Sequence, residues 1–528
     1  MRSWMLEAAL RGAAPRAFPT ASLENMLWVL LVLAFIHALG ALAVGINQPL
    51  LDMDYFRQTQ TALTTYWLLK GGPWLAYQTP ALGAPWSVPF EFPVYELITA
   101  AVAAIGVPLD AAGRLVAFGF FLGSLLPLRI LFDELKLGQV SYLATAILFL
   151  TCPLYLYWSR TFLIETCALF FAVLWLALLV RYLNRRVWTA VAGALAAGCL
   201  AILAKSTTFP AFTVLGSAIA AVTLGRDWFA GERKASLTDL AVVAALIGVP
   251  YVVGVAWTSY ADAIKMENEF GRSLTMRVLW RYYVGDLHDR LTAKLWLDAV
   301  YVRVIPDTLG ALSLLGIAAL GATLTSRRTL IAATGALVGF VVPFLLFTHI
   351  HMTHIYYQSA NAIFLVAAVG VGIGRIYDAG QRVVGLFVIA AIAAGQLLFF
   401  YHRFFPALIS DYTNNQLLRI AQIARDATQP GQSLIVIGAD AQGSAVPYYA
   451  ERKGLGLDPE IPLPLMQRVF AEPQRYLGDV PLGGVVYCID QLPAYGASIP
   501  AIQSFIAGRA VVGEFGGCQL LGTRRPPS

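Results

Sequence analysis

The 528-residue chain is 58% hydrophobic, and only 13% of its residues are Asp, Glu, Lys or Arg. An ordinary soluble domain carries about 25% charged residues, and a mean hydropathy of +0.67 indicates that lipid surrounds most of this chain. The composition excludes a soluble enzyme, a fibrous protein and a disordered scaffold. The net charge of +6 does not indicate nucleic acid as a partner, because the basic residues lie in short loops between apolar runs.

Apolar runs of about 20 residues, the length that crosses a bilayer, recur along the first 401 residues. The first is too long for a signal-peptide core and no small-residue cleavage site follows it, so we expect it to remain as an anchor. The stretch 92–107 is too short for a span and contains Glu96, which predicts an interfacial or re-entrant helix. We expect about eleven transmembrane helices, at residues 26–46, 115–132, 140–157, 161–180, 187–204, 208–224, 237–257, 307–324, 329–347, 355–374 and 383–401.

The distribution of basic residues predicts the orientation, because cytoplasmic loops carry an excess of Lys and Arg. With a cytoplasmic N-terminus, the opposite short loops hold only Arg160 and Lys205. The extracytoplasmic segments are then a first loop at 47–114, a middle loop at 258–306 and a tail at 402–528. The cytoplasmic side holds Arg2, Arg11, Arg16, Arg129, Lys136, Arg181, Arg185, Arg186, Arg226, Arg233, Lys234, Arg327, Arg328, Arg375 and Arg382.

The tail predicts a small α/β domain in water, separate from the transmembrane domain at 1–401. A polar helix at 415–427 precedes the strand-like SLIVIG at 433–438, and β-branched runs bounded by Gly and Pro follow at 483–489 and 509–515. Cys488 and Cys518 lie in this tail, and an extracytoplasmic location permits a disulfide between them without requiring it. The chain contains no internal repeat, which weakens a transporter interpretation because many transporters contain paired repeats.

The first loop opens with LDMDYFRQTQTA, just after the first span. Asp52 and Asp54 lie at the expected membrane surface, and Arg57 and Gln58 share one face of a helix that starts near Asp54. A carboxylate here suits proton transfer near neutral pH. The alternative is a solvated loop in which one aspartate caps the helix.

Two further acids, Glu91 and Glu96, follow in PFEFPVYE. Acids beside aromatics at the boundary of water and lipid are expected to have raised pKa values. Exposed or salt-bridged interfacial acids are the alternative interpretation.

Two ionisable residues are unusual for their apolar surroundings. Glu165 lies just inside an apolar run, where a carboxylate usually faces a partner or a water-filled cavity, and Arg160 is its candidate ion-pair partner. Lys205 lies in LAKSTTFP beside three hydroxyl groups. That arrangement suits a phosphate, although snorkelling of the ammonium group to the interface explains it equally well.

Three of the six histidines, His349, His351 and His354, lie in THIHMTHIYYQ together with Tyr356 and Tyr357. The spacing permits a divalent cation such as Mg²⁺ or Mn²⁺ but matches no zinc signature. Hydrogen bonds to a sugar or phosphate are the competing interpretation.

The middle loop mixes basic and aromatic residues, which predicts a surface segment that contacts lipid head groups or a substrate phosphate. These residues are Lys265, Arg272, Arg277, Trp280, Arg281, Tyr282, Tyr283, Arg290, Lys294 and Trp296.

The order of these features resembles the membrane glycosyltransferases of the GT-C fold, and most closely glycosyltransferase family 39, which includes protein O-mannosyltransferases and the aminoarabinose transferase of lipid A. The resemblance covers about residues 26–401 and rests on an acidic motif after the first span and an acid beside proline before the second. FRQTQTA, FEFP and, in the tail, PYYAERKG are similar to segments of bacterial members. Two departures are Asp54-Tyr55 in place of the Asp-Glu pair of the mannosyltransferases, and Phe92-Pro93 in place of the double proline of the aminoarabinose enzymes.

The resemblance implies a bacterial inner-membrane enzyme that transfers a sugar from a polyprenyl-phosphate donor to a hydroxyl group of a lipid, glycan or protein. Asp54 matches the family's first-loop acid, which would act as general base on the acceptor hydroxyl or position it, with Asp52 as the alternative. Glu91 matches the second acid, so these three are the expected catalytic residues. No second carboxylate is placed as retention requires, so we expect inversion. The expected substrate-binding residues are Arg57, Gln58, Arg160, Glu165, Lys205, His351, His354, Tyr356 and Tyr357.

Two other classes of function compete with this interpretation. A transporter or flippase for a lipid-linked sugar would place its ionisable groups near the bilayer midplane, whereas here they concentrate at one face. A non-catalytic assembly protein whose tail binds a cell-wall component would leave the first-loop acids without a role.

Overall fold

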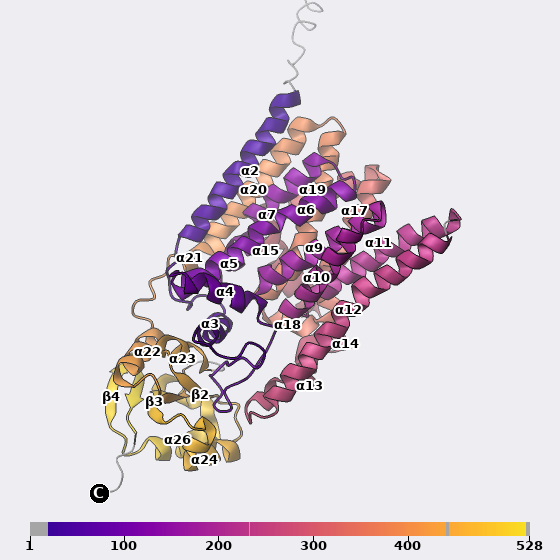
Figure 1. Cartoon of the computed structure of the whole chain (residues 1–528). Coiled ribbons are helices and arrows are strands. Elements are labelled where there is room, and N and C mark those ends of the chain that lie inside the picture. The colour runs from indigo at the N-terminus through magenta and orange to yellow at the C-terminus, as the bar shows by residue number, and fades with distance from the viewer. Residues whose placement is uncertain (1–19, 232, 440–442, 524–528) are drawn as a thin grey trace, which may run out of the picture.

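The computed structural model describes residues 20–231, 233–439 and 443–523. A bundle of long helices carries a small sheet domain at one end (Figure 1). Of the basic residues used to predict the orientation, Arg2, Arg11 and Arg16 lie outside the described residues, as do the side chains of Arg233 and Lys234.

Every run predicted as a span is mainly helical. Eight described segments are long and apolar enough to cross a membrane, which confirms a multi-pass helical membrane protein. Six lie within α2 (Thr20–Ala43), α9 (Glu165–Arg185), α11 (Phe209–Phe229), α12 (Arg233–Lys265), α17 (Arg327–Leu346) and α20 (Arg382–Arg403), and a seventh joins α5 (Leu109–Gly123) to α6 (Leu125–Glu134).

The eighth segment, Lys294–Thr325, is not one regular helix. Gly310 has a φ of 75° and lies so close to the backbone of Gln396 in α20 that a side chain there would clash. The chain turns at this point and continues as short pieces. They are η2 (Lys294–Val304), α15 (Ile305–Leu309), η3 (Gly310–Leu312), α16 (Ser313–Leu320) and η4 (Gly321–Thr325).

The three remaining predicted spans are shorter helices. They are α7 (Gln139–Thr151, followed by α8, Pro153–Trp158), α10 (Trp188–Ala204) and α19 (Ala362–Asp378), with 13, 17 and 17 residues in α7, α10 and α19. The total of eleven spans therefore stays a prediction.

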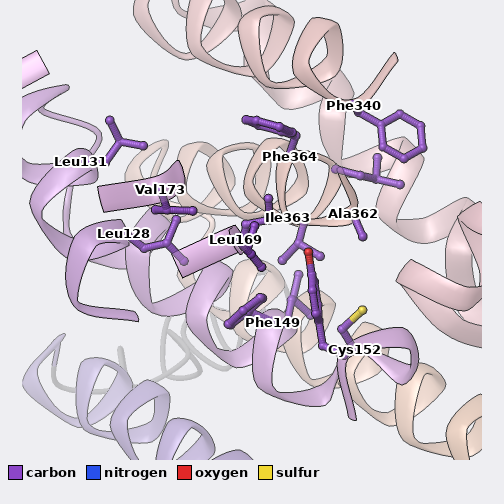
Figure 2. Packing of buried hydrophobic residues seen from close by; sticks show 14 of the residues in the cluster. Leu128, Leu131, Phe149, Cys152, Leu169, Val173, Phe340, Ala362, Ile363 and Phe364 are labelled. Carbon is purple, nitrogen blue, oxygen red and sulfur yellow. The ribbon is translucent and has the colours of Figure 1, made fainter. Parts of the chain in front are cut away.

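The bundle core is packed around α7, α9 and α19. Phe149, Leu169 and Ile363 belong to its apolar cluster (Figure 2). Gly370 and Gly374, one turn apart on α19, face Thr145 and Ser141 of α7 so closely that any side chain would collide. Small residues at this spacing let two helix backbones approach.

The first loop contains two helices, α3 (Tyr55–Leu69) and α4 (Val94–Ala104). The 11 residues of α4 rise about 16 Å, roughly half of the hydrocarbon core of a bilayer. The helix is therefore too short to cross, in agreement with the predicted interfacial or re-entrant helix.

The middle loop begins later than the apolar run suggests, because α12 continues to Lys265. η1 (Gly271–Leu274), α13 (Met276–Val284) and α14 (Leu287–Leu291) follow. No side chain of α13 is buried, although Val278 and Trp280 are apolar. An amphipathic helix with this exposure fits the predicted contact with lipid head groups.

The segment from 348 to 408 completes the bundle. It contains α18 (Thr348–Thr353), η5 (Ile355–Ala360), α19, α20 and α21 (Phe405–Leu408).

The tail forms a five-stranded sheet in the order β2-β1-β3-β5-β4, in which β1 is parallel to β2 and β3 and the other pairs are antiparallel. The predicted α/β region in the tail is confirmed. Its elements are α22 (Gln416–Ala427), β1 (Ser433–Ile437), α23 (Ala445–Ala450), β2 (Lys453–Leu457), α24 (Leu463–Ala471), α25 (Pro473–Leu477), β3 (Leu482–Cys488), η7 (Ile489–Ser498), α26 (Ile499–Ile506), β4 (Val511–Phe515) and β5 (Cys518–Leu521).

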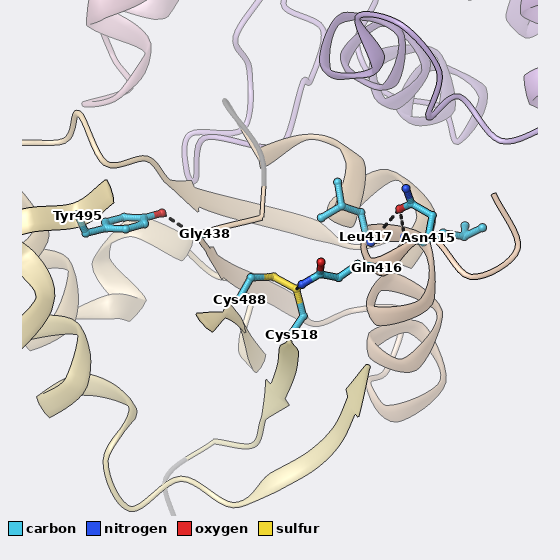
Figure 3. Close-up of a disulfide and its surroundings, with 8 residues drawn as sticks. Asn415, Gln416, Leu417, Gly438, Cys488, Tyr495 and Cys518 are labelled. Atoms are coloured by element: carbon cyan, nitrogen blue, oxygen red, sulfur yellow. Dashed lines mark hydrogen bonds between the residues drawn. A yellow bond between two sulfur atoms is a disulfide. The ribbon is translucent and has the colours of Figure 1, made fainter. Parts of the chain in front are cut away.

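A disulfide joins Cys488 at the end of β3 to Cys518 at the start of β5 (Figure 3). The two residues are directly opposite each other in the antiparallel pair. This settles the pairing that the sequence left open.

Hydrogen bonds from the PYYAERKG segment connect the sheet domain to the first loop. Tyr448 donates to Asp110 of α5, and the Tyr449 hydroxyl accepts a hydrogen bond of 2.5 Å from the backbone N–H of Leu50. The backbone N–H of Gly454 donates to the Pro80 carbonyl over 2.8 Å. The motif that resembled a family segment therefore lies at the junction of the two regions.

Candidate functional site

Asp54 lies immediately before α3 in a left-handed backbone conformation, with a φ of 52°. Its side chain makes no capping hydrogen bond, contrary to the capping alternative. The carboxylate Oδ1 lies 3.9 Å from Nδ1 of His354, and both side chains are about one-fifth exposed. The His354 Nε2 atom lies 2.8 Å from the Tyr282 hydroxyl. Asp54 is therefore a positioned and accessible carboxylate.

Asp52, only two residues away, is buried. Its Oδ1 accepts a hydrogen bond of 2.5 Å from Gln58 Nε2, and its Oδ2 lies 3.7 Å from Nη1 of the equally buried Arg160. Burial lowers the pKa of Arg160 to about 10. Arg160 was expected to pair with Glu165, and the structure corrects this expectation because the guanidinium faces the first loop.

Arg57 and Gln58 were expected on one face of α3, but their side chains have different partners. Gln58 links the first loop to the turn before α9. Besides Asp52, it contacts the backbone N–H of Phe162, which donates to its Oε1 over 3.1 Å. Asp52, Gln58 and Arg160 thus form one buried network that holds the beginning of α3 against the turn before α9.

Arg57 binds the second acid of the first loop. Its Nη2 lies 2.7 Å from Oε2 of Glu91. Burial opposes ionisation of this carboxyl group, but Arg57 and Lys205 together hold the pKa of Glu91 below its ordinary value. The expectation of a raised pKa is therefore wrong for Glu91, because the sequence did not reveal that two cations surround it.

Glu96 in the first turn of α4 shows the opposite behaviour. Burial raises the pKa of its carboxyl group to about 8. Its Oε2 is buried and has no hydrogen-bond partner within the described ranges. At neutral pH the side chain is therefore mainly a neutral acid.

Lys205 and Glu165 form a buried ion pair, with side chains 5% and 3% exposed. The Lys205 ammonium also lies 3.7 Å from the ring centre of Tyr357 and 5.0 Å from that of Tyr356. Burial lowers the pKa of Lys205, although Glu165 and Glu91 oppose the shift. Snorkelling to the interface does not describe this side chain, because its charge is enclosed by protein.

A pocket opens beside Lys205 and encloses about 640 Å³ of empty space, including its mouth. Glu91, Lys205, Ser206, Thr207 and Lys265 supply polar groups, and most of the other lining side chains are aliphatic or aromatic. Lys265 lies 2.8 Å from Oδ1 of Asp262. The remaining lining residues include Phe90, Trp257, Met276, Leu279, Tyr283 and Tyr357. Cations beside an apolar wall can hold an anionic group that carries an apolar chain.

The three histidines of residues 348–358 do not come together as metal ligands. His351 is fully buried, its Nδ1 lies 3.1 Å from Gln358 Oε1, and burial lowers its pKa to about 4. Across residues 20–231, 233–439 and 443–523, no group of three or more His, Cys, Asp or Glu side chains is arranged to hold a metal ion. A requirement for Mg²⁺ or Mn²⁺ stays a prediction from the sequence.

Two residues near the site were not identified from the sequence. Trp257 lines the pocket and donates its indole N–H to the Phe90 carbonyl over 3.0 Å. Arg114 is fully buried and donates to the carbonyls of Ile46 and Gln48, over 3.0 and 2.5 Å. Trp257 is the last residue of a predicted span, a position where interfacial tryptophans are common. Arg114 immediately precedes the predicted span at 115–132, and nothing in the sequence there indicated that its side chain is buried.

No protein-family model matches the sequence, and no curated protein matches it significantly. Solved structures do match. The crystal structure of ArnT from Cupriavidus metallidurans bound to undecaprenyl phosphate has a TM-score of 0.63 at 15% identity, covering 94% of this chain and 97% of that one. The apo form of the same ArnT has a TM-score of 0.62 at 14% identity over the same shares.

A third similar structure is that of the arabinofuranosyltransferase AftD from Mycobacteria, with a TM-score of 0.54 at 13% identity. The alignment covers 94% of this chain but 40% of AftD. The likeness extends over the bundle and the sheet domain together. The chain therefore has the GT-C fold that its motifs predicted.

Proposed function

We propose that this protein is a membrane glycosyltransferase that takes a sugar from a polyprenyl-phosphate donor and transfers it to an acceptor hydroxyl group. The observation that carries the proposal is the arrangement of the buried Lys205, the Arg57–Glu91 pair and the accessible Asp54 at one end of a GT-C bundle. The acceptor is a lipid, glycan or protein.

In this proposal the donor phosphate occupies the pocket beside Lys205. Lys205 and Lys265 supply positive charge there, and Ser206 and Thr207 also line the pocket. Ammonium groups in a site that excludes water stabilise the charge on a departing phosphate more strongly than they would in water. The undecaprenyl phosphate bound to ArnT supports a donor of this class.

Transfer needs one bond to form and one to break. The acceptor oxygen attacks the anomeric carbon, the bond from that carbon to the phosphate oxygen breaks, and polyprenyl phosphate leaves with the electron pair. The acceptor proton passes to the Asp54 carboxylate, which His354 and its partner Tyr282 help to orient. A single displacement inverts the anomeric centre.

Other residues of the predicted site receive supporting roles. Arg57 holds Glu91 ionised beside the pocket, and Tyr356 and Tyr357 cover the Lys205 ammonium. The buried Asp52, Gln58 and Arg160 position the loop that carries Asp54, and Glu165 positions Lys205. His351 contributes a neutral, buried ring that fixes the turn before Tyr356.

We place the protein in a bacterial inner membrane, with the N-terminus in the cytoplasm and the sheet domain outside it. The Cys488–Cys518 disulfide supports this orientation, because such bonds persist in oxidising compartments. A thiol-reactive probe that cannot cross the membrane should label a Gln491→Cys variant in intact cells. Labelling only after lysis would reverse the orientation.

The proposed activity is tested with purified protein in lipid nanodiscs and a panel of polyprenyl-phosphate sugars. Release of polyprenyl phosphate together with a glycosylated product supports the transferase. The competing function is a flippase for the same lipid-linked sugar. Movement of intact donor across sealed vesicles, without any release, would replace the transferase by the flippase.

A further inference from the structure

A second and much larger cavity lies between α6, α9, α11, α17 and α19. It encloses about 1990 Å³ of empty space, including its open side, and its lining is mainly aliphatic and aromatic. Leu131, Val173, Ile363 and Phe364 belong to the lining and are seen in Figure 2. Nothing in the proposed transfer reaction uses this cavity.

Three arginines stand at one end of the cavity. Arg226 lies in the last turn of α11, and Arg327 and Arg328 open α17. All three are exposed. Since α11 starts beside Lys205 and ends near Arg226, the arginines lie at the end of the bundle opposite the proposed donor phosphate.

The cavity is deep and open to the side. Its lining follows α11 from Arg226 back to Phe212, a rise of about 21 Å, which exceeds half of the roughly 30 Å hydrocarbon core. Val222 and Ile331 of the lining are 76% and 61% exposed. An apolar opening on a membrane bundle faces acyl chains rather than water.

We propose that this cavity is a binding site for an anionic phospholipid of the leaflet at the arginine end. The lipid phosphate binds Arg226, Arg327 and Arg328, and one acyl chain lies along α11 in the cavity. Basic residues at the membrane surface between transmembrane helices attract anionic head groups, and guanidinium groups match phosphate geometry. The apolar wall supplies the burial that holds the chain.

The test is native mass spectrometry of the full chain, delipidated in detergent and titrated with phosphatidylglycerol or with zwitterionic phosphatidylcholine. Arg226→Gln/Arg327→Gln/Arg328→Gln should weaken phosphatidylglycerol binding on the order of 100-fold, because each basic residue contributes roughly fivefold. The matched control removes three charges at the same end that do not line the cavity. That control, Arg129→Gln/Arg375→Gln/Arg382→Gln, should change binding less than threefold.

A second variant tests the cavity itself without altering charge. Ala332→Phe/Ala336→Phe places two rings in the space beside α17 and should abolish tight binding while all three arginines remain. Equal binding of both lipids, or unchanged binding in both test variants, would overturn the proposal. Displacement of phosphatidylglycerol by polyprenyl phosphate, one for one and with the same sensitivity to the arginine variant, would also overturn it by assigning the cavity to the donor.

Discussion

Charged residues are arranged differently at the two ends of the bundle. Near the sheet domain, both members of the Asp52–Arg160 and Glu165–Lys205 pairs are at most 5% exposed. At the other end, Glu134 is buried but its partner Arg185 is 56% exposed.

This difference bears on function. Burial of both charges in a pair costs desolvation that the attraction between them often fails to repay, so such pairs are weak sources of stability. The exposed arginines at the end opposite the sheet domain follow the positive-inside pattern with little loss of hydration. We infer that the buried pairs near the sheet domain are retained for the site that they build.

The largest effects are expected when one member of a buried ion pair is removed. Lys205→Met should lower the free energy of unfolding by about 3 kcal/mol or more, because Glu165 keeps a buried charge without a partner. It should also reduce donor turnover at least 100-fold through loss of the phosphate contact. Thermal unfolding and polyprenyl phosphate release measure the two effects.

A second variant separates these two roles. Glu165→Gln/Lys205→Met removes both charges, so stability should return towards that of the wild type while turnover stays low. Normal turnover in this double variant would show that Lys205 serves only the fold.

The two aspartates of the first loop should differ in the same way, one buried and paired and the other partly exposed. Asp52→Asn should destabilise the protein by about 3 kcal/mol, because it leaves the buried Arg160 without its counter-charge. Asp54→Asn should change stability by less than about 1 kcal/mol, because Asp54 is partly exposed and asparagine also tolerates the left-handed conformation. Similar melting temperatures for the two variants would contradict the assigned roles.

The raised pKa of Glu96 predicts that the stability of the fold depends on pH. Its pKa rises from 4.5 to about 8 on folding, so the native state binds the extra proton and stability falls as pH rises through that interval, by up to about 1.4 kcal/mol per pH unit. Glu96→Gln should nearly match the wild type at pH 5 and exceed it by up to about 4 kcal/mol at pH 8. Parallel pH profiles for Glu96→Gln and wild type would refute the buried neutral acid.

The smallest effect is expected at the far end of the bundle. Arg129 and Asp133 form an exposed pair four residues apart. Arg129→Ala should therefore change stability by less than about 1 kcal/mol and leave turnover unchanged. A large loss of stability or turnover in Arg129→Ala would contradict the proposed difference between the two ends of the bundle.

Much of the fold follows from local sequence signals. Long apolar runs predicted the helices, and β-branched runs predicted β1, β3 and β4 near their observed places. β2 was missed because KGLGL contains two glycines and no β-branched residue, and β5 because CQLL is short. Both strands form through tertiary pairing with neighbours that the sequence alone does not identify.

The candidate site was predicted less completely. Motifs indicated Asp54, Glu91 and Lys205, but not which charges face one another. Arg160 pairs with Asp52 and Lys205 with Glu165 across long separations in the chain. The sign of the Glu91 pKa shift depends on such contacts, which explains why local surroundings suggested the wrong direction.

The most direct test of Asp54 as the general base is a single-turnover experiment on wild type and Asp54→Asn in nanodiscs, with a saturating active donor and acceptor. Donor binding and the appearance of polyprenyl phosphate are followed separately. A positioned general base accelerates a reaction about 100-fold to 10,000-fold, so we expect the variant to bind donor normally but to release polyprenyl phosphate at least 100-fold more slowly. Release at the wild-type rate would contradict Asp54 as the base and with it the proposed mechanism.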